Sequence, residues 1–204
     1  AVHYAGIACE MKEIMRIGKK YNLSIIEDNA HGIFGEYYGK KLGSIGHLAT
    51  QSFHETKNIS CGEGGALIIN NKKFYTRAEI IREKGTNRSR FIRGEVDKYT
   101  WVDKGSSYLL SDILSAVLLN QLKSSHKIQL RRKNIWDGYH KNLRDWCEKN
   151  NIIQPMIPIY CKQSYHMYYL LLPNKKLKEK FINYLLKLNI KASSHYQPLH
   201  SSPF

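Results

Sequence analysis

Apolar positions in the first part of the chain follow two different periods. Between residues 9 and 21 they recur at helical spacing with lysines between them, which predicts an amphipathic helix. The run from 23 to 27 is short, is rich in β-branched residues and ends at Asp28. Such a run predicts a buried strand that leads into a loop.

Two further short apolar runs, 48–53 and 66–69, predict strands on either side of a polar segment with a glycine-rich turn at 62–65. A helix is expected at 74–84 and a long polar loop at 85–107. Because helices alternate with short strands, we expect an α/β fold whose sheet is covered on both faces.

The second half of the chain begins with a strongly apolar helix at 111–122, for which Ser111 is the expected N-cap. A longer, charged helix is expected to follow to about residue 150. Beyond the proline-containing segment at 155–158, the pattern predicts a small α+β tail. Its expected elements are a strand at 166–172, a helix at 177–188 and a strand at 190–194.

Charge and cysteine content bear on the class of protein. The 204-residue chain has a net charge of +15, which would suit a nucleic-acid-binding protein. Its basic residues are dispersed over predicted helix starts and polar faces, as on a solvated surface. The four cysteines form no Cys-x-x-Cys pair, so we expect free thiols, no metal site and a cytoplasmic setting.

The two ends and the longest apolar runs bear on the extent of the chain. Residue 1 is alanine, and the opening lacks the pattern of a signal peptide. The chain ends in a loop-like stretch, so we expect a fragment that is truncated at both ends. No apolar run approaches the roughly 20 residues of a membrane span, and no span is expected.

Lys57 follows a predicted strand within the segment Ser52-Phe53-His54-Glu55-Thr56-Lys57-Asn58. A lysine there is an amine nucleophile if its surroundings lower its pKa from about 10.4. A solvated surface lysine is the ordinary alternative. Cys61, in the same loop, is expected to be a small packed residue rather than a nucleophile.

Asp28 follows the end of another predicted strand, in Glu27-Asp28-Asn29-Ala30-His31. In pyridoxal phosphate chemistry an aspartate pairs with the ring nitrogen, so that the ring accepts electrons. Capping of a turn is the alternative role for Asp28. The Ser52 hydroxyl is a candidate ligand for the cofactor phosphate, and the glycines at 62–65 allow a ligand to approach the backbone closely.

These segments closely resemble the DegT/DnrJ/EryC1/StrS family of sugar aminotransferases, which have the fold-type I pyridoxal-phosphate architecture. The similarity continues through 82–89, 94–101 and 105–112 and is densest between residues 1 and 122. It implies that residues 1–124 are the C-terminal part of the large cofactor-binding α/β domain. Residues 125–204 would then be an incomplete small C-terminal α+β domain.

The resemblance also implies roles for individual residues. Lys57 matches the lysine that holds pyridoxal 5'-phosphate as a Schiff base, and Asp28 matches the partner of the ring nitrogen. His31 matches the residue near the ring hydroxyl, and Ser52 matches a phosphate ligand. His166 and His195 are candidate substrate-binding residues of the small domain, with a structural role as the alternative.

The long loop is similar to that of family members which transfer an amino group from L-glutamate to C4 of dTDP-4-keto-6-deoxy-D-glucose. Their product is dTDP-4-amino-4,6-dideoxy-D-galactose, a precursor of enterobacterial common antigen. The resemblance implies a homodimer with shared active sites. Ser107 stands where many relatives have an asparagine that reaches the phosphate bound by the neighbouring subunit.

Several alternatives remain open. The keto-sugar could differ, and a dehydratase would carry histidine in place of Lys57. The family's N-terminal portion, with its phosphate-binding turn and ring-stacking aromatic residue, is absent from this sequence, so an inactive fragment is a further alternative. A nucleic-acid-binding protein is the alternative from another class, although the sequence has no recognisable binding motif.

Overall fold

A computed structural model of the chain describes residues 1–203. Its contacts divide the chain into two compact units. Unit 1 comprises residues 1–137 and 156–168, and unit 2 comprises residues 138–155 and 169–203 of the described chain. The division falls inside helix α5 (Ser125–Asn142). The expected domains 1–124 and 125–204 remain a prediction for the whole protein.

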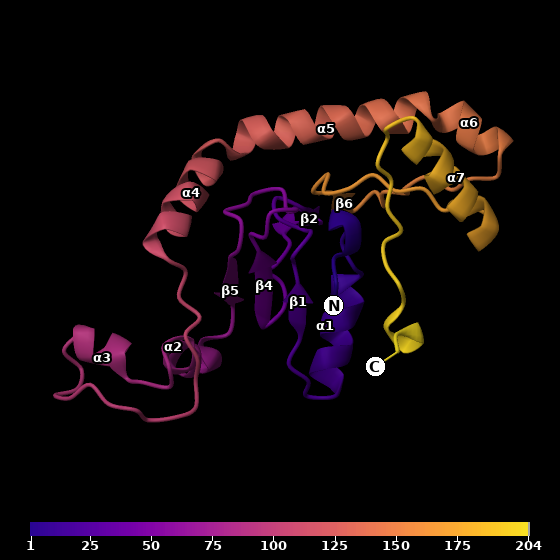
Figure 1. The fold of residues 1–204 in the computed structure, drawn as a ribbon. Coiled ribbons are helices and arrows are strands. Elements are labelled where there is room, and N and C mark those ends of the chain that lie inside the picture. The colour runs from indigo at the N-terminus through magenta and orange to yellow at the C-terminus, as the bar shows by residue number, and fades with distance from the viewer. Residues whose placement is uncertain (204) are drawn as a thin grey trace. The chain divides into compact units, whose positions relative to one another are not determined.

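The main sheet of unit 1 has the strand order β1-β4-β5 (Figure 1). Strand β1 (Ile26–Asp28) is parallel to β4 (Leu48–Ser52), and β4 is antiparallel to β5 (Gly65–Ile69). The three strands predicted from the sequence are therefore present. Leu67 in β5 is half exposed and none of the five β5 residues is buried, so within residues 1–203 this edge strand is not covered on both faces as predicted.

Helix α1 (Met11–Lys20) confirms the predicted amphipathic helix and lies beside β1 in Figure 1. Its Met11 is fully buried, and Ile14 and Met15 pack against the same core. A small antiparallel sheet borders this core, with the order β3-β2-β6. Its strands β2 (Glu36–Tyr37), β3 (Lys40–Lys41) and β6 (Cys161–Lys162) bring residues 161–168 close to the first quarter of the chain.

The segment after β5 contains the predicted helix and one more. A 3-10 turn, η2 (Lys72–Phe74), leads into α2 (Tyr75–Arg82). The expected loop at 85–107 contains the short helix α3 (Arg88–Ile92), which the polar sequence did not reveal. Ion pairs that join Arg93 to Glu79 and Glu95 hold this segment together.

Ser111 caps α4 (Asp112–Lys123), as predicted: its hydroxyl accepts a hydrogen bond from the Leu114 N–H at 3.3 Å. Leu114 and Leu118 of this helix pack against the buried cluster formed by Phe53, Ile59 and Cys61. Helix α4 is therefore in contact with the loop that carries Lys57. The predicted long charged helix is divided into α5 and α6 (Arg144–Lys149).

Unit 2 contains the predicted helix of the tail, α7 (Lys175–Lys187), capped by Asn174. The predicted strands at 166–172 and 190–194 are wrong. Within the described part of the tail, Leu171 forms only an isolated bridge with Ile153, and residues 190–194 form no strand. These runs have strand-like composition but lack the partner strands that a ladder needs.

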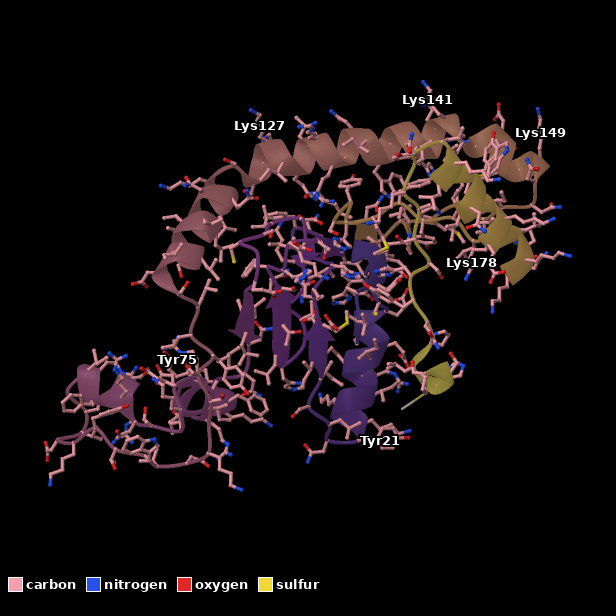
Figure 2. All side chains as sticks on the ribbon, viewed as in Figure 1. Tyr21, Tyr75, Lys127, Lys141, Lys149 and Lys178 are labelled. Atoms are coloured by element: carbon pink, nitrogen blue, oxygen red, sulfur yellow. The ribbon has the colours of Figure 1, made fainter. Side chains whose placement is uncertain are left out.

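The cationic residues are distributed over the surface. Figure 2 shows Lys127, Lys141 and Lys149 projecting outward from the helices that carry them, and all three are exposed. This distribution fits the solvated helix faces predicted from the sequence. Among residues 1–203, no helix is both long enough and apolar enough to cross a bilayer.

Candidate active site

The two strands that carry the candidate chemistry are adjacent and parallel. Asp28 pairs with Thr50, two residues before Ser52 at the end of β4. The carboxyl ends of β1 and β4 therefore meet at one edge of the sheet, which is where open α/β sheets bind their ligands. Asp28, Ser52 and the Lys57 loop belong to this edge.

Asp28 is fixed by the backbone on both sides. Its N–H donates to Ala1 O at 2.7 Å, and its carbonyl oxygen accepts from the His3 N–H at 3.1 Å. The half-buried carboxylate accepts a hydrogen bond from the Ala30 N–H at 3.0 Å through Oδ1. The carboxylate thus also caps the turn after β1, so the two roles considered for Asp28 are compatible.

Lys57 lies in a tight turn after β4, where its N–H donates to His54 O at 2.9 Å. Partial burial lowers the pKa of the Lys57 amine, and the nearby negative charge of Asp28 offsets this effect in part. The two side chains are thus within electrostatic reach of each other. A lowered pKa leaves more of the amine neutral, which is the form that attacks an aldehyde.

The loop around Lys57 is closed by a buried turn. Phe53 N–H donates to Gly64 O at 2.7 Å, and Cys61 N–H donates to Phe53 O at 3.0 Å. Gly62 has φ +90°, a conformation that favours glycine. The Cys61 thiol is buried and donates to Glu63 O at 3.3 Å, which agrees with the packed role expected for Cys61.

The other predicted site residues are placed as follows. Ser52 Oγ accepts the His54 N–H at 3.3 Å, beside the Lys57 turn. The His31 ring is buried and stacks on the half-buried ring of His166, with centroids 4.1 Å apart. Ser107 is exposed, and its backbone forms an isolated antiparallel bridge with Glu83, the residue that follows α2. His195 belongs to unit 2, where its ring contacts Tyr196.

Sequence reasoning missed the buried polar groups behind the site. Asn29 Nδ2 donates to Gln51 Oε1 at 2.9 Å and to Leu42 O at 3.1 Å, which ties the turn after β1 to β4. Asn58, the neighbour of Lys57, bonds to Ser164 and His166. Asn29 and Asn58 stand within the two motifs noted in the sequence, but no local pattern marks Ser164.

Glu27 supports the strand that ends at Asp28. Its fully buried carboxylate accepts from His3 Nε2 at 2.8 Å and from the N–H groups of Gly43, Ile45 and Gly46 at 2.5–2.8 Å. His3 Nδ1 accepts the Cys9 N–H, so Nε2 carries the proton that His3 donates. Burial acts to raise the pKa of Glu27, but the four hydrogen bonds outweigh it and lower the pKa below its usual value.

This lowered pKa predicts acid sensitivity of the fold. Since Glu27 is more acidic when folded, its contribution to stability is present above its unfolded pKa, about 4.3, and is lost as the pH falls through the folded pKa. Glu27→Gln places an amide donor against backbone donors. We expect it to cost about 2–4 kcal/mol at pH 7 and to weaken the loss of stability in acid.

Denaturant titrations of the complete protein from pH 3 to 8 measure this effect, with the exposed Glu148→Gln in α6 as the control. A Glu27→Gln variant as stable as the control at pH 7 would show that the hydrogen bonds to Glu27 do not stabilise the fold.

The sequence matches the DegT/DnrJ/EryC1/StrS aminotransferase family over residues 1–204, and the chain belongs to that family. The fold-type I architecture expected from the sequence is confirmed. The family consists of enzymes that use pyridoxal phosphate, so the predicted cofactor and enzyme class are confirmed at the level of the family.

Individual relatives match this chain along its whole length, but the match covers only about half of each relative. An uncharacterized protein of Methanocaldococcus jannaschii is 37% identical over 209 residues, which span 100% of this chain and 53% of that protein. A Campylobacter jejuni UDP-4-amino-4,6-dideoxy-N-acetyl-beta-L-altrosamine transaminase is 34% identical and is covered over 52% of its length. The chain spans about half the length of the curated relatives it matches.

A solved structure shows the same relation. The Helicobacter pylori aminotransferase involved in the biosynthesis of pseudoaminic acid superposes with a TM-score of 0.86 at 28% identity. The superposition covers 99% of this chain and 53% of the Helicobacter protein. The similarity therefore extends through both units of the chain.

Proposed function

We propose that this chain carries the catalytic lysine of a sugar-nucleotide aminotransferase. The enzyme would transfer the amino group of L-glutamate to the C4 keto group of a nucleotide-linked 6-deoxy sugar. The observation that carries the proposal is that Lys57 lies within electrostatic reach of Asp28, and that burial lowers the pKa of its amine. Asp28 ends β1, and Lys57 lies in the turn beyond the adjacent parallel strand β4. Membership of the family supports a cofactor-binding role for both residues.

The residues fit pyridoxal phosphate. The site supplies an amine with a lowered pKa, a carboxylate within its electrostatic reach and a serine hydroxyl beside the same turn. When bound, the cofactor supplies an electron sink for the carbanion formed at the amino donor. Lys57 would hold it covalently, Asp28 would keep its ring nitrogen protonated, and Ser52 would bind its phosphate. His31 would lie near its ring hydroxyl.

Lys57 has a second task in this proposal. The free Nζ would take the proton from Cα of the amino donor in the first half of the reaction and would deliver a proton to C4 of the sugar in the second half. An amine whose pKa is lowered toward the working pH exchanges protons more effectively in both directions. The aspartate charge limits how far that pKa falls.

For the sugar, we propose dTDP-4-keto-6-deoxy-D-glucose, with dTDP-4-amino-4,6-dideoxy-D-galactose as the product. Support comes from the likeness of the loop at 85–107 to family members with that activity. The names of two relatives instead point to other sugars: the Campylobacter transaminase carries a UDP-linked sugar in its name, and an Escherichia coli O157:H7 relative, 30% identical, is a GDP-perosamine synthase. The nucleotide is thus the first property to test.

We further propose a homodimer in which Ser107 acts at the partner's site. Ser107 is exposed, and its backbone is held against Glu83 rather than in the Lys57 turn. His166 and His195 are proposed to contact the sugar. We expect the enzyme to work in the cytoplasm, a reducing setting that fits the four free cysteines.

The test uses the complete protein from the natural reading frame, purified with pyridoxal phosphate. It is given 15N-labelled L-glutamate with dTDP-, UDP- or GDP-linked 4-keto-6-deoxy sugars, and label at C4 of each product is measured by mass spectrometry and NMR. We expect label in the dTDP-linked product, with galacto configuration. Label in a UDP- or GDP-linked product alone would refute the dTDP proposal, and label in none would refute sugar transamination.

A further inference from the structure

We propose that Asn58 and His166 act as a positioning pair that couples the backbone beside Lys57 to the ring of His31. The inference rests on the proposed function and adds two residues to its machinery. In this role His166 serves both halves of the reaction, including the half in which no sugar takes part. A residue that only contacts the sugar would serve one half.

Asn58 is held by both ends of its amide. The residue is 4% exposed. Nδ2 donates to Ser164 O at 2.7 Å and to Gln129 Oε1 at 3.3 Å. Oδ1 lies 2.8 Å from His166 Nδ1, and since an amide oxygen only accepts, the histidine donates. A buried amide with these partners has one orientation, and it fixes the residue that follows Lys57.

His166 extends this link to His31. The two rings are stacked, with centroids 4.1 Å apart and planes 17° apart. His31 Nδ1 accepts the Ala5 N–H at 3.2 Å, so the neutral ring carries its proton on Nε2. Ser164, whose carbonyl oxygen accepts the hydrogen bond from Asn58 Nδ2, also donates a hydrogen bond from its hydroxyl to His31 O. The ring and the backbone of His31 are thus held by the segment that holds Asn58.

That segment is itself anchored from behind. Ser164 N–H donates to Gly6 O at 3.1 Å. Gly6 has φ +82°, and a Cβ there would lie 1.8 Å from Ser164 Oγ, so only glycine allows this approach. Arg132 Nη1 of α5 donates to His166 O at 3.0 Å. The histidine is therefore placed by its backbone as well as by its ring.

Two substitutions of His166 affect its hydrogen bond and its ring stack differently. His166→Phe keeps a ring against His31 but leaves the buried Oδ1 of Asn58 without its donor, which releases the Lys57 turn. His166→Asn removes the ring but places an amide donor close to the position of Nδ1. Comparison of the two variants therefore separates the effect of the hydrogen bond from the effect of the ring stack.

The first measurement is the rate at which L-glutamate alone changes the absorption of the cofactor bound to the complete protein. A displacement of about 1 Å costs on the order of a hundredfold, so we expect His166→Phe and Asn58→Ala to slow this half-reaction by about 10- to 100-fold. His166→Asn, which restores a donor to Asn58 Oδ1 but not the ring stack on His31, should recover part of the rate lost in His166→Phe. His126→Phe, an exposed site on α5, is the matched control.

The second measurement is made on the cofactor-free protein by 15N NMR of the imidazoles. We expect His31 to carry its proton on Nε2 in the unmodified protein and in His166→Phe, and this signal to change in His166→Asn. The Nδ1–H signal of His166 should disappear in Asn58→Ala. Persistence of that signal would overturn the hydrogen bond on which the pair depends.

The kinetic outcomes separate the two proposals. If cofactor does not attach to Lys57 in the unmodified protein, the proposed function fails. If it attaches but His166→Phe and Asn58→Ala leave the glutamate half-reaction unchanged, the positioning pair is overturned while the function stands. Equal losses in His166→Phe and His166→Asn would also overturn it, because the hydrogen bond would then not be the link.

Discussion

Replacement of Lys57 by arginine should abolish transamination in the complete protein. Arginine keeps the positive charge but is always protonated and forms no covalent bond with the cofactor aldehyde. The loss should be on the order of 10⁴- to 10⁶-fold in kcat, as when a catalytic nucleophile is removed. The steady-state rate of 2-oxoglutarate formation from L-glutamate measures it.

Lys40→Arg is the matched control for this substitution. Lys40 lies on β3, is exposed and has no part in the proposed chemistry. We expect Lys40→Arg to retain the activity of the unmodified protein and Lys57→Arg to retain its fold by circular dichroism. Activity of a folded Lys57→Arg variant above a hundredth of normal would be incompatible with Lys57 as the covalent anchor.

Asp28→Asn should produce the second largest loss, on the order of 10²- to 10³-fold in kcat, as for the removal of one preorganised electrostatic group. The amide keeps the size of the side chain but cannot hold a proton on the ring nitrogen. The same change removes the negative charge that supports the ammonium form of Lys57, so the pKa of that amine should fall further.

The two effects of Asp28→Asn have opposite expected consequences. The cofactor-free variant should react faster with an aldehyde probe at pH 7, because more of Lys57 is neutral, while transamination is lost. The pH dependence of probe labelling, followed at the Lys57 peptide, measures the shift. If Asp28→Asn loses both probe labelling and transamination, the site has collapsed, and the two proposed roles of Asp28 are not supported.

Local patterns were sufficient to predict most elements of the fold. The period of α1, the short runs of β1, β4 and β5, and the Ser111 cap of α4 each depend on residues close in sequence. The predicted strands at 166–172 and 190–194 were wrong because a strand also needs a distant partner. The hairpin of β2 and β3 was missed because two-residue strands leave no measurable alternation.

The candidate site likewise combines residues that local motifs point to with contacts that only the tertiary fold creates. Two short motifs made Asp28 and Lys57 candidate site residues, and the structure places β1, which ends at Asp28, next to β4, which precedes the Lys57 turn. The stack of His31 on His166 joins residues from opposite ends of unit 1, and Asn58 bonds across 106 residues to Ser164. No spacing within one motif encodes such contacts, since they depend on the tertiary fold around residues 161–168.

The covalent attachment of pyridoxal phosphate is the central claim and can be tested directly. The complete protein is incubated with the cofactor, reduced with borohydride and digested, and the modified lysine is located by peptide mass spectrometry. The account predicts a single pyridoxyl group on Lys57, absent from the Lys57→Arg variant. A pyridoxyl group on another lysine, or none after saturation with cofactor, would contradict it.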